Sequence, residues 1–139
     1  MYKNQTDYYV HKWIGDLLYE GRSYSDALKA YQEIEESTLF DVEIMKCKCL
    51  LRMSDLNKLS DCLTKLTKLE DCNESMVQVD ILAVGLLKIL TKPHENKESA
   101  SKIKKLNGLL EGNSVGYIFG LIDCMNLLGV ATFDAGRYE

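Results

Sequence analysis

Apolar residues at helical spacing, arranged in paired stripes around short polar breaks, constrain the fold of this chain more than any other feature. The first stripe follows the i, i+3, i+4, i+7 spacing of one helix face and consists of Val10, Trp13, Ile14, Leu17 and Leu18. After a break at "GRS" (residues 21–23), a second stripe consists of Ala27, Ala30, Tyr31 and Ile34. Ser23 or Ser25 can cap the helix that follows the break. The pattern predicts helices over residues 5–20 and 24–36, joined as an antiparallel hairpin.

A second hairpin repeats the pattern of the first. When Gly15 is aligned with Cys47, the same shift aligns Ala27 with Leu59, Tyr31 with Leu63 and Ile34 with Leu66. We call this match the hairpin alignment. Leucines at steps of three and four mark the second helix of this pair. Helices are therefore expected over residues 41–53 and 55–69.

The remaining sequence continues the series. A third pair is expected over residues 74–91 and 97–111, separated by a turn that contains Pro93. The segment "LLGVATFDAGRYE" repeats the opening stripe, with Gly129 in the place of Gly15, and the last helix is expected over 115–135. A helix pair that recurs at a nearly constant period is typical of a solenoid. The expected fold is all-α, with about seven antiparallel helices in three and a half pairs.

Small and large residues alternate in the first hairpin in a way that indicates close helix packing. Gly15 and Ala27 are expected to face each other across the pair, and Tyr31 is expected to fill the space beside them. With Ile14, these residues resemble the tetratricopeptide repeat family, in which a large residue and Gly are followed by Ala and then an aromatic residue. His11 replaces the usual Trp of that family, and Leu39 replaces the usual Pro. The resemblance implies a helical solenoid that binds other proteins.

A looser resemblance concerns the segment "DVEIMKCKCLLRMSDLNKLSDCL", which follows the first hairpin. It is similar to the amino-terminal repeats of scaffold subunits of the anaphase-promoting complex, a ubiquitin ligase of the cell cycle. That likeness implies homodimerisation within a larger assembly. A chaperone-binding repeat protein is the alternative within the family. It is disfavoured because Asp16 replaces the Asn that would hold a ligand carboxylate.

Composition limits the class of protein. The 139 residues suit one domain spanning 1–139, expected to be a fragment of a longer repeat protein. The formal net charge of −4 disfavours a nucleic-acid partner, which normally selects a basic face. The first residues lack the pattern of a signal peptide, and the five Cys have no secretory spacing. Reduced, unpaired thiols and a cytoplasmic or nuclear location are therefore expected.

Neither catalysis nor metal binding is indicated by the residue pattern. His11 and His94 have no Cys or Ser partner at a telling spacing, and no cofactor is expected. Cys47 and Cys49 diverge around a helix and lack the second ligand pair of a zinc site. A helical enzyme without a recognisable motif remains an alternative.

The apolar run from Val115 to Phe133 raises the question of a membrane-docked adaptor. It is almost long enough to span a bilayer. However, Asp123 and Asn126 lie at its middle, and a central Asp costs about 2.5–3.5 kcal/mol on insertion. The run therefore favours a helix buried between protein neighbours.

The leading hypothesis is a protein–protein interaction scaffold that holds a peptide or partner helix. The expected partner-binding face lies on the first helix of each of the first two pairs and comprises Tyr9, Lys12, Asp16, Tyr19, Glu20, Lys48, Leu51 and Arg52. The last helix is too apolar to bury all its large side chains on one neighbour, so a homodimer is expected. The expected self-association residues are Tyr117, Phe119, Ile122, Leu127 and Phe133, although Trp13 and the tyrosines of the first hairpin could supply the contact instead.

Overall fold

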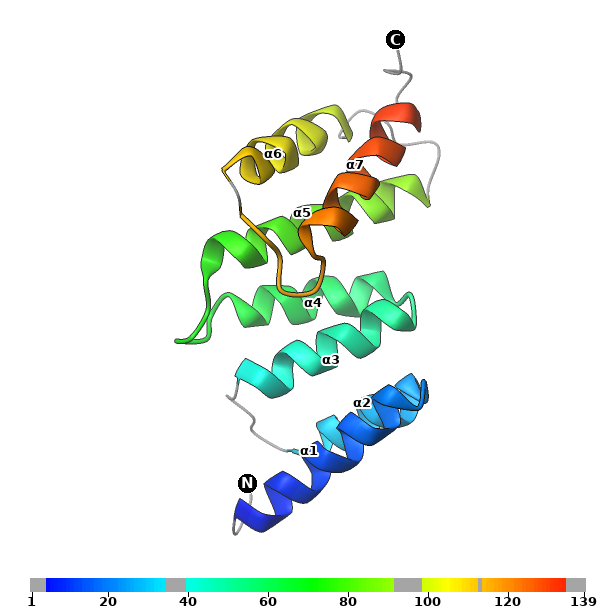
Figure 1. Cartoon of the computed structure of the whole chain (residues 1–139), viewed down its shortest axis with the longest axis vertical. Helices are drawn as coiled ribbons and strands as arrows, with labels where there is room; N and C mark the ends of the chain where they lie inside the picture. The colour runs from blue at the N-terminus through cyan, green and yellow to red at the C-terminus, as the bar shows by residue number, and fades with distance from the viewer. Residues whose placement is uncertain (1–4, 35–39, 92–98, 113, 135–139) are drawn as a thin grey trace. The chain divides into compact units, whose positions relative to one another are not determined.

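The protein is all-helical over the residues that the computed structural model describes, which are 5–34, 40–91, 99–112 and 114–134. Within these ranges it forms seven α-helices and no strand (Figure 1). The helices are α1 (Gln5–Glu20), α2 (Tyr24–Gln32), α3 (Phe40–Arg52), α4 (Leu56–Leu66), α5 (Glu74–Leu90), α6 (Ser99–Glu111) and α7 (Leu121–Asp134). The all-α prediction is confirmed for this part of the chain.

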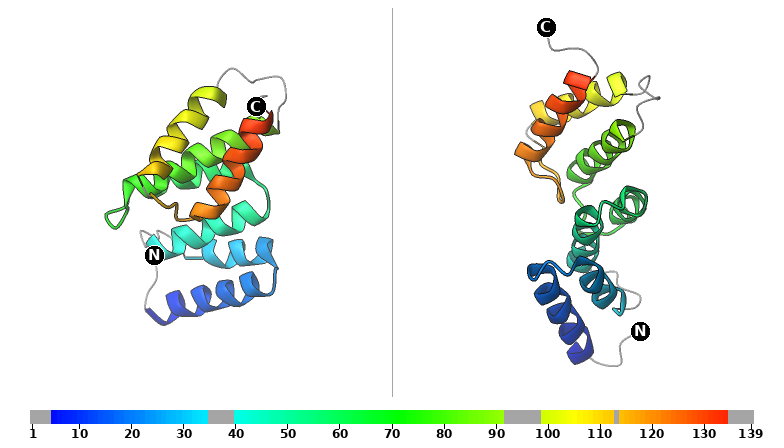
Figure 2. Two further views of the ribbon diagram at one scale, coloured as in Figure 1. Left: turned by 45° about the horizontal axis from the view of Figure 1, so that its top comes forward. Right: turned by 90° about the vertical axis from the view of Figure 1, so that its right-hand side faces the viewer.

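The chain divides into two compact units, Met1–Asp71 and Cys72–Glu139. In the first unit each helix packs against the next along the chain: α1 on α2, α2 on α3 and α3 on α4. Figure 2 shows α1 and α2, and likewise α3 and α4, as antiparallel neighbours. The helices of this unit start within one position of the expected residues, but α2 ends at Gln32 and not at the predicted 36, and α4 ends at Leu66 and not at the predicted 69.

The two hairpin turns of this unit have the same backbone structure, at positions that the hairpin alignment pairs. Ser23 N–H donates to Leu18 O at 2.9 Å, and Asp55 N–H donates to Leu50 O at 3.0 Å. The residues before them, Arg22 and Ser54, have φ of 65° and 59°. A left-handed residue followed by this backward hydrogen bond is the Schellman ending of a helix. The alignment that relates the two sequences therefore relates two matching local structures.

Burial follows the same alignment. The matched positions are buried in both hairpins: Gly15 and Cys47, Ala27 and Leu59, Tyr31 and Leu63, Ile34 and Leu66. A Cβ on Gly15 would lie 2.6–2.9 Å from three ring carbons of Tyr31, closer than carbon atoms pack. The Tyr31 ring is thus the side-chain group nearest to Gly15. The absence of a side chain at this position allows α1 to lie against a fully buried aromatic ring.

Replacing Gly15 by Ala should destabilise the first unit. The added methyl group would collide with the Tyr31 ring, and overpacking of this kind costs about 1–3 kcal/mol. Gly108→Ala in α6 is a matched control, because nothing lies within 4 Å of a Cβ built there. That control should instead gain up to about 1 kcal/mol from helix propensity. Urea unfolding of both variants measures the difference, and equal stabilities would contradict the close approach at Gly15.

In the second unit, α6 and α7 both pack against α5 and against each other (Figure 2). The side chains of α5 are buried along most of its length; the buried set is Val77, Val79, Asp80, Ala83, Val84, Leu86 and Ile89. A helix contacted by two neighbours buries more than one face, which explains its nearly continuous apolar sequence.

The prediction that the last helix begins near residue 115 is wrong, because α7 begins at Leu121. Residues 117–119 instead direct their backbone N–H groups at the carboxylate of Asp80 on α5. Tyr117 and Ile118 donate to Oδ2 at 2.6 and 3.1 Å, and Phe119 donates to Oδ1 at 2.9 Å. A Cβ at Gly116 would collide with the same carboxylate. These three bonds fix the segment that leads into α7, so we call them the Asp80 clasp.

Burial determines the pH at which the Asp80 carboxyl group loses its proton. The Asp80 side chain is fully buried, and desolvation raises its pKa. The three backbone N–H hydrogen bonds lower the pKa by less, so the net result is a rise from 3.8 to about 6. Between about pH 4 and pH 6, Asp80 therefore keeps its proton in the folded unit, whereas the same carboxyl group is ionised in the unfolded chain. The contribution of Asp80 to stability is fully present below about pH 4 and is lost as the pH rises through 6.

The free energy of unfolding should reflect this loss. We expect the difference between the wild-type protein and Asp80→Asn to shrink by about 2–3 kcal/mol as the pH rises from 4 to 7, because the variant has no group that ionises at this position. Urea unfolding followed by circular dichroism at several pH values measures it. A difference that is independent of pH, or that grows with pH, would contradict the raised pKa.

Candidate protein-interaction surfaces

The outer side of α1 carries a stripe of exposed large apolar side chains, which we call the α1 stripe. It consists of Tyr9, Val10, Trp13, Ile14 and Leu17, with exposed fractions of 61%, 43%, 65%, 41% and 53%. Their spacing places them on one side of the helix. Gly15 lies on the opposite side, against Tyr31. The contact that buries Gly15 therefore leaves the most apolar side of α1 in water.

Two of the expected partner-binding residues, Lys12 and Asp16, are bonded within the chain. The Tyr31 hydroxyl donates to Asp16 Oδ1, and Lys12 Nζ donates to Asp16 Oδ2 at 3.1 Å. Burial, followed by the hydrogen bond to Asp16, raises the pKa of Tyr31, so its hydroxyl remains a donor. Lys12 thus pairs with a carboxylate of its own helix.

The other expected partner-binding residues differ in exposure. Glu20 and Arg52 are exposed, whereas Tyr19, Lys48 and Leu51 are partly buried. The ring of Tyr19 lies edge-on against Tyr24 of α2, with centroids 5.3 Å apart. In the described part of the chain, α1 and α3 make no extensive contact with each other. Five of the eight residues lie on α1 and three on α3, and the extensive helix contacts of this unit join α1 to α2 and α2 to α3.

The expected self-association residues separate into buried and exposed groups. Phe119 and Leu127 are buried, with exposed fractions of 8% and 9%, so neither is available to a partner in this fold. Tyr117 lies in the segment before α7, and its hydroxyl accepts a hydrogen bond from Asn73 N–H at 2.9 Å. Ile122 and Phe133 are 73% and 63% exposed. Together with Met125 and Val130 they form a second apolar surface, on α7.

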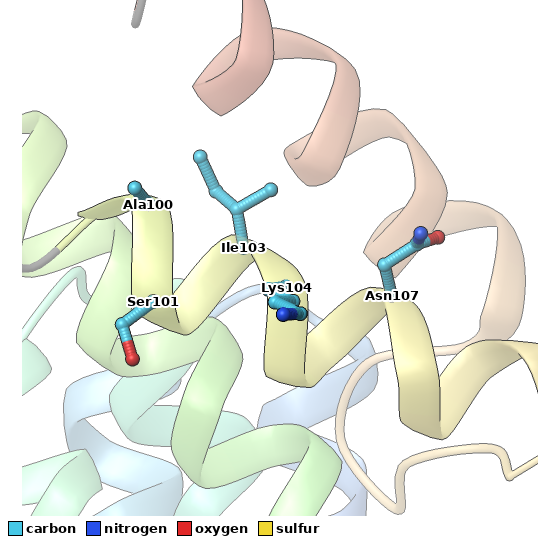
Figure 3. Close-up of a pocket in the computed structure, with 5 residues that line it drawn as sticks. All are labelled: Ala100, Ser101, Ile103, Lys104 and Asn107. Atoms are coloured by element: carbon cyan, nitrogen blue, oxygen red, sulfur yellow. The ribbon is translucent and has the colours of Figure 1, made fainter.

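A shallow cavity of about 490 Å³ lies along α6. Its lining residues are Ala100, Ser101, Ile103, Lys104 and Asn107, which all belong to that one helix (Figure 3). Small-molecule sites usually draw polar groups from several elements onto one point. This lining contains one ammonium, one amide and one hydroxyl without an acid–base pair, so it does not indicate a reaction.

Two buried carboxylates are the main features that the sequence analysis missed. Asp80 forms the clasp described above. Glu43 of α3 is 1% exposed, and its Oε1 accepts from Lys46 Nζ at 3.2 Å and from Lys65 Nζ of α4 at 3.4 Å. The signal for Asp80 was a single acidic residue in the apolar run "MVQVDILAVGLL". An isolated charge in such a run requires a buried partner.

Cysteine pairing differs from the expectation. The structure joins Cys47 of α3 to Cys62 of α4 in a disulfide, with Cα atoms 6.1 Å apart. The prediction that the thiols are unpaired is therefore wrong for these two. Cys49, Cys72 and Cys124 are free thiols, and burial raises the pKa of Cys49 and of Cys124 to about 11.

A metal site and a membrane-spanning helix are both absent from the described residues. His11 is half-buried on α1, and His94 lies outside the described residues. Among the described side chains, no group of three or more His, Cys, Asp or Glu residues is placed to hold a metal ion. In the same part of the chain, no helix has the length and apolar character needed to cross a bilayer. Comparisons with family models, with curated proteins and with solved structures find no match for this chain.

Proposed function

We propose that this chain is a protein–protein interaction scaffold that self-associates, and that the α1 stripe is the surface through which it does so. The observation that carries the proposal is the exposure of Trp13 and four other large apolar side chains on the side of α1 opposite Gly15. Exposed apolar patches of this size on soluble proteins commonly mark binding surfaces. Trp and Tyr are also the residues that contribute most often to binding energy at interfaces.

The area of the α1 stripe suits a second copy of the chain. The exposed fractions correspond to roughly 500–600 Å² per copy, so pairing removes roughly 1,000–1,200 Å² from water, near the lower end of the range for specific interfaces. A two-fold contact is the commonest way to cover such a surface, because each copy presents the same patch.

The charges of α1 are spaced to fit an antiparallel pair of α1 helices. Lys12 and Asp16 are equally distant from Ile14 along the helix. A two-fold axis near Ile14 therefore brings Lys12 of each copy level with Asp16 of the other. A carboxylate has about four acceptor sites, so Asp16 can accept from a second ammonium while it keeps its bonds to Tyr31 and Lys12.

The wider setting of the proposal comes from the sequence resemblance. We propose a tetratricopeptide-type scaffold that holds a peptide or partner helix within a larger cytoplasmic or nuclear assembly, with the scaffold subunits of the anaphase-promoting complex as the particular model. The hairpin turn that recurs at aligned positions supports the first of these suggestions.

Trp13 allows the self-association to be tested directly, because it is the only Trp in the chain. We expect a dimer at micromolar concentration in sedimentation experiments, and a blue shift of Trp emission as the concentration increases. Leu17→Glu should weaken the association by at least about tenfold, since it places a charge in the apolar contact. Ile122→Glu, on the equally exposed surface of α7, is the matched control and should have no effect.

Two outcomes would contradict the proposal in different ways. If Ile122→Glu abolishes the dimer and Leu17→Glu does not, the interface lies on α7. If the wild-type chain is still a monomer of 15.8 kDa when its concentration is raised 100-fold above the micromolar range, and its Trp emission does not shift, self-association is excluded.

A further inference from the structure

The Cys47–Cys62 disulfide lies in the middle of the α3–α4 hairpin. Cys47 is fully buried, whereas Cys62 is partly exposed. Their Cα separation of 6.1 Å lies within the range of protein disulfides. Three further cysteines remain thiols, and two of them, Cys49 and Cys124, are buried. One bond among five cysteines differs from the even, fully paired framework of small secreted domains.

The hairpin has contacts that do not depend on the disulfide. Leu59, Leu63 and Leu66 of α4 are fully buried. The Lys65 ammonium of α4 pairs with the buried Glu43 carboxylate of α3 at 3.4 Å. These contacts hold the two helices together whether or not the sulfur atoms are bonded.

The surroundings of Cys62 also accept a reduced thiol. Its Sγ lies 3.6 Å from the carbonyl oxygen of Glu43, which is the distance of a hydrogen bond from a thiol. Reduction would therefore give the Cys62 S–H group an acceptor without a change in the backbone. The same hairpin thus accommodates both oxidation states.

We propose that Cys47 and Cys62 form a reversible, redox-responsive staple between α3 and α4, which exchanges with small-molecule disulfides such as oxidised glutathione. This inference does not depend on the proposed self-association. Disulfides that form in reducing compartments are usually transient or redox-sensing. Exposed disulfides are also more labile than buried structural ones.

The difference in exposure assigns a role to each sulfur. The Cys62 thiolate attacks one sulfur of oxidised glutathione, which forms a mixed disulfide and releases one glutathione thiolate. The buried Cys47 thiolate then attacks Cys62 Sγ, which forms the staple and releases the second glutathione thiolate. The two cysteines lose two protons and two electrons, and the oxidised glutathione gains both. Reduction reverses these steps, and external thiolate again reaches Cys62 first.

The consequence of the staple is a change in the resistance of the first unit to unfolding. The bond closes a loop over a sequence separation of 15 residues, which restricts the unfolded chain more than the folded one. For a unit of this size, we expect the melting temperature of the oxidised protein to exceed that of the reduced protein by on the order of 10 °C.

A glutathione redox titration of the intact chain tests the proposal. After each equilibration, free thiols are alkylated and counted by mass spectrometry, and the linked peptide is identified. We expect the Cys47 and Cys62 thiols to disappear together as the ratio of oxidised to reduced glutathione increases. The buried Cys49 and Cys124 should remain thiols throughout, and the melting temperature should follow the linked fraction.

Single substitutions separate the staple from general effects of oxidation. Cys62→Ser should abolish both the linked peptide and the redox dependence of the melting temperature, and Cys62→Ala serves if the first variant folds poorly. Cys72→Ser is the matched control, because Cys72 is also partly exposed and lies in the second unit. It should leave both effects intact.

Three results would overturn the proposal. One is a bond that persists in millimolar reduced glutathione, which would make the disulfide a permanent structural one. Another is the accumulation of a mixed disulfide at Cys62 without the internal bond. The third is a linked peptide with no shift in melting temperature.

Discussion

The packing of Gly15 against the ring of Tyr31 determines how α1 is oriented, and the main proposed surface depends on that orientation. The ring occupies the space where any other residue would place its Cβ, so only Gly allows this approach. The Tyr31 hydroxyl then reaches Asp16, the next residue along α1, and fixes the helix about its own axis. With that side of α1 against α2, Trp13 and Leu17 point away from the unit. The exposed stripe is thus a consequence of a single close contact.

The second hairpin uses the same turn and a different set of contacts between its helices. The hairpin alignment places Cys47 where the first hairpin has Gly15, so the second hairpin carries a side chain at that position. The α3–α4 pair is held by the Glu43–Lys65 ion pair, by buried leucines and by the Cys47–Cys62 bond. The aligned sequences therefore give the same turn with two kinds of contact between the helices, and the second kind includes a disulfide.

The sequence was sufficient to predict the parts of the fold that depend on local periodicity. Apolar spacing located the first hairpin, and the hairpin alignment correctly paired buried positions such as Tyr31 and Leu63. It did not reveal the bond between Cys47 and Cys62, because helical spacing places residues on a face without defining which residue of a neighbouring helix they meet. It also did not separate Phe119 and Leu127, which are buried, from Ile122 and Phe133, which are exposed. Hydrophobicity alone cannot make that distinction when a helix is apolar on most sides.

α7 begins later than its sequence predicts, and the physical cause lies in another helix, far away in the sequence. Residues 115–120 are apolar and continue the pattern of the helix that follows, so a local analysis extends the helix through them. Asp80 is buried in α5, and a carboxylate in that position needs donors. The donors that it finds are the backbone N–H groups of residues 117–119, which can reach it only outside a continuous helix. The Asp80 clasp therefore holds residues 117–119 outside the helix, and α7 begins after them, at Leu121.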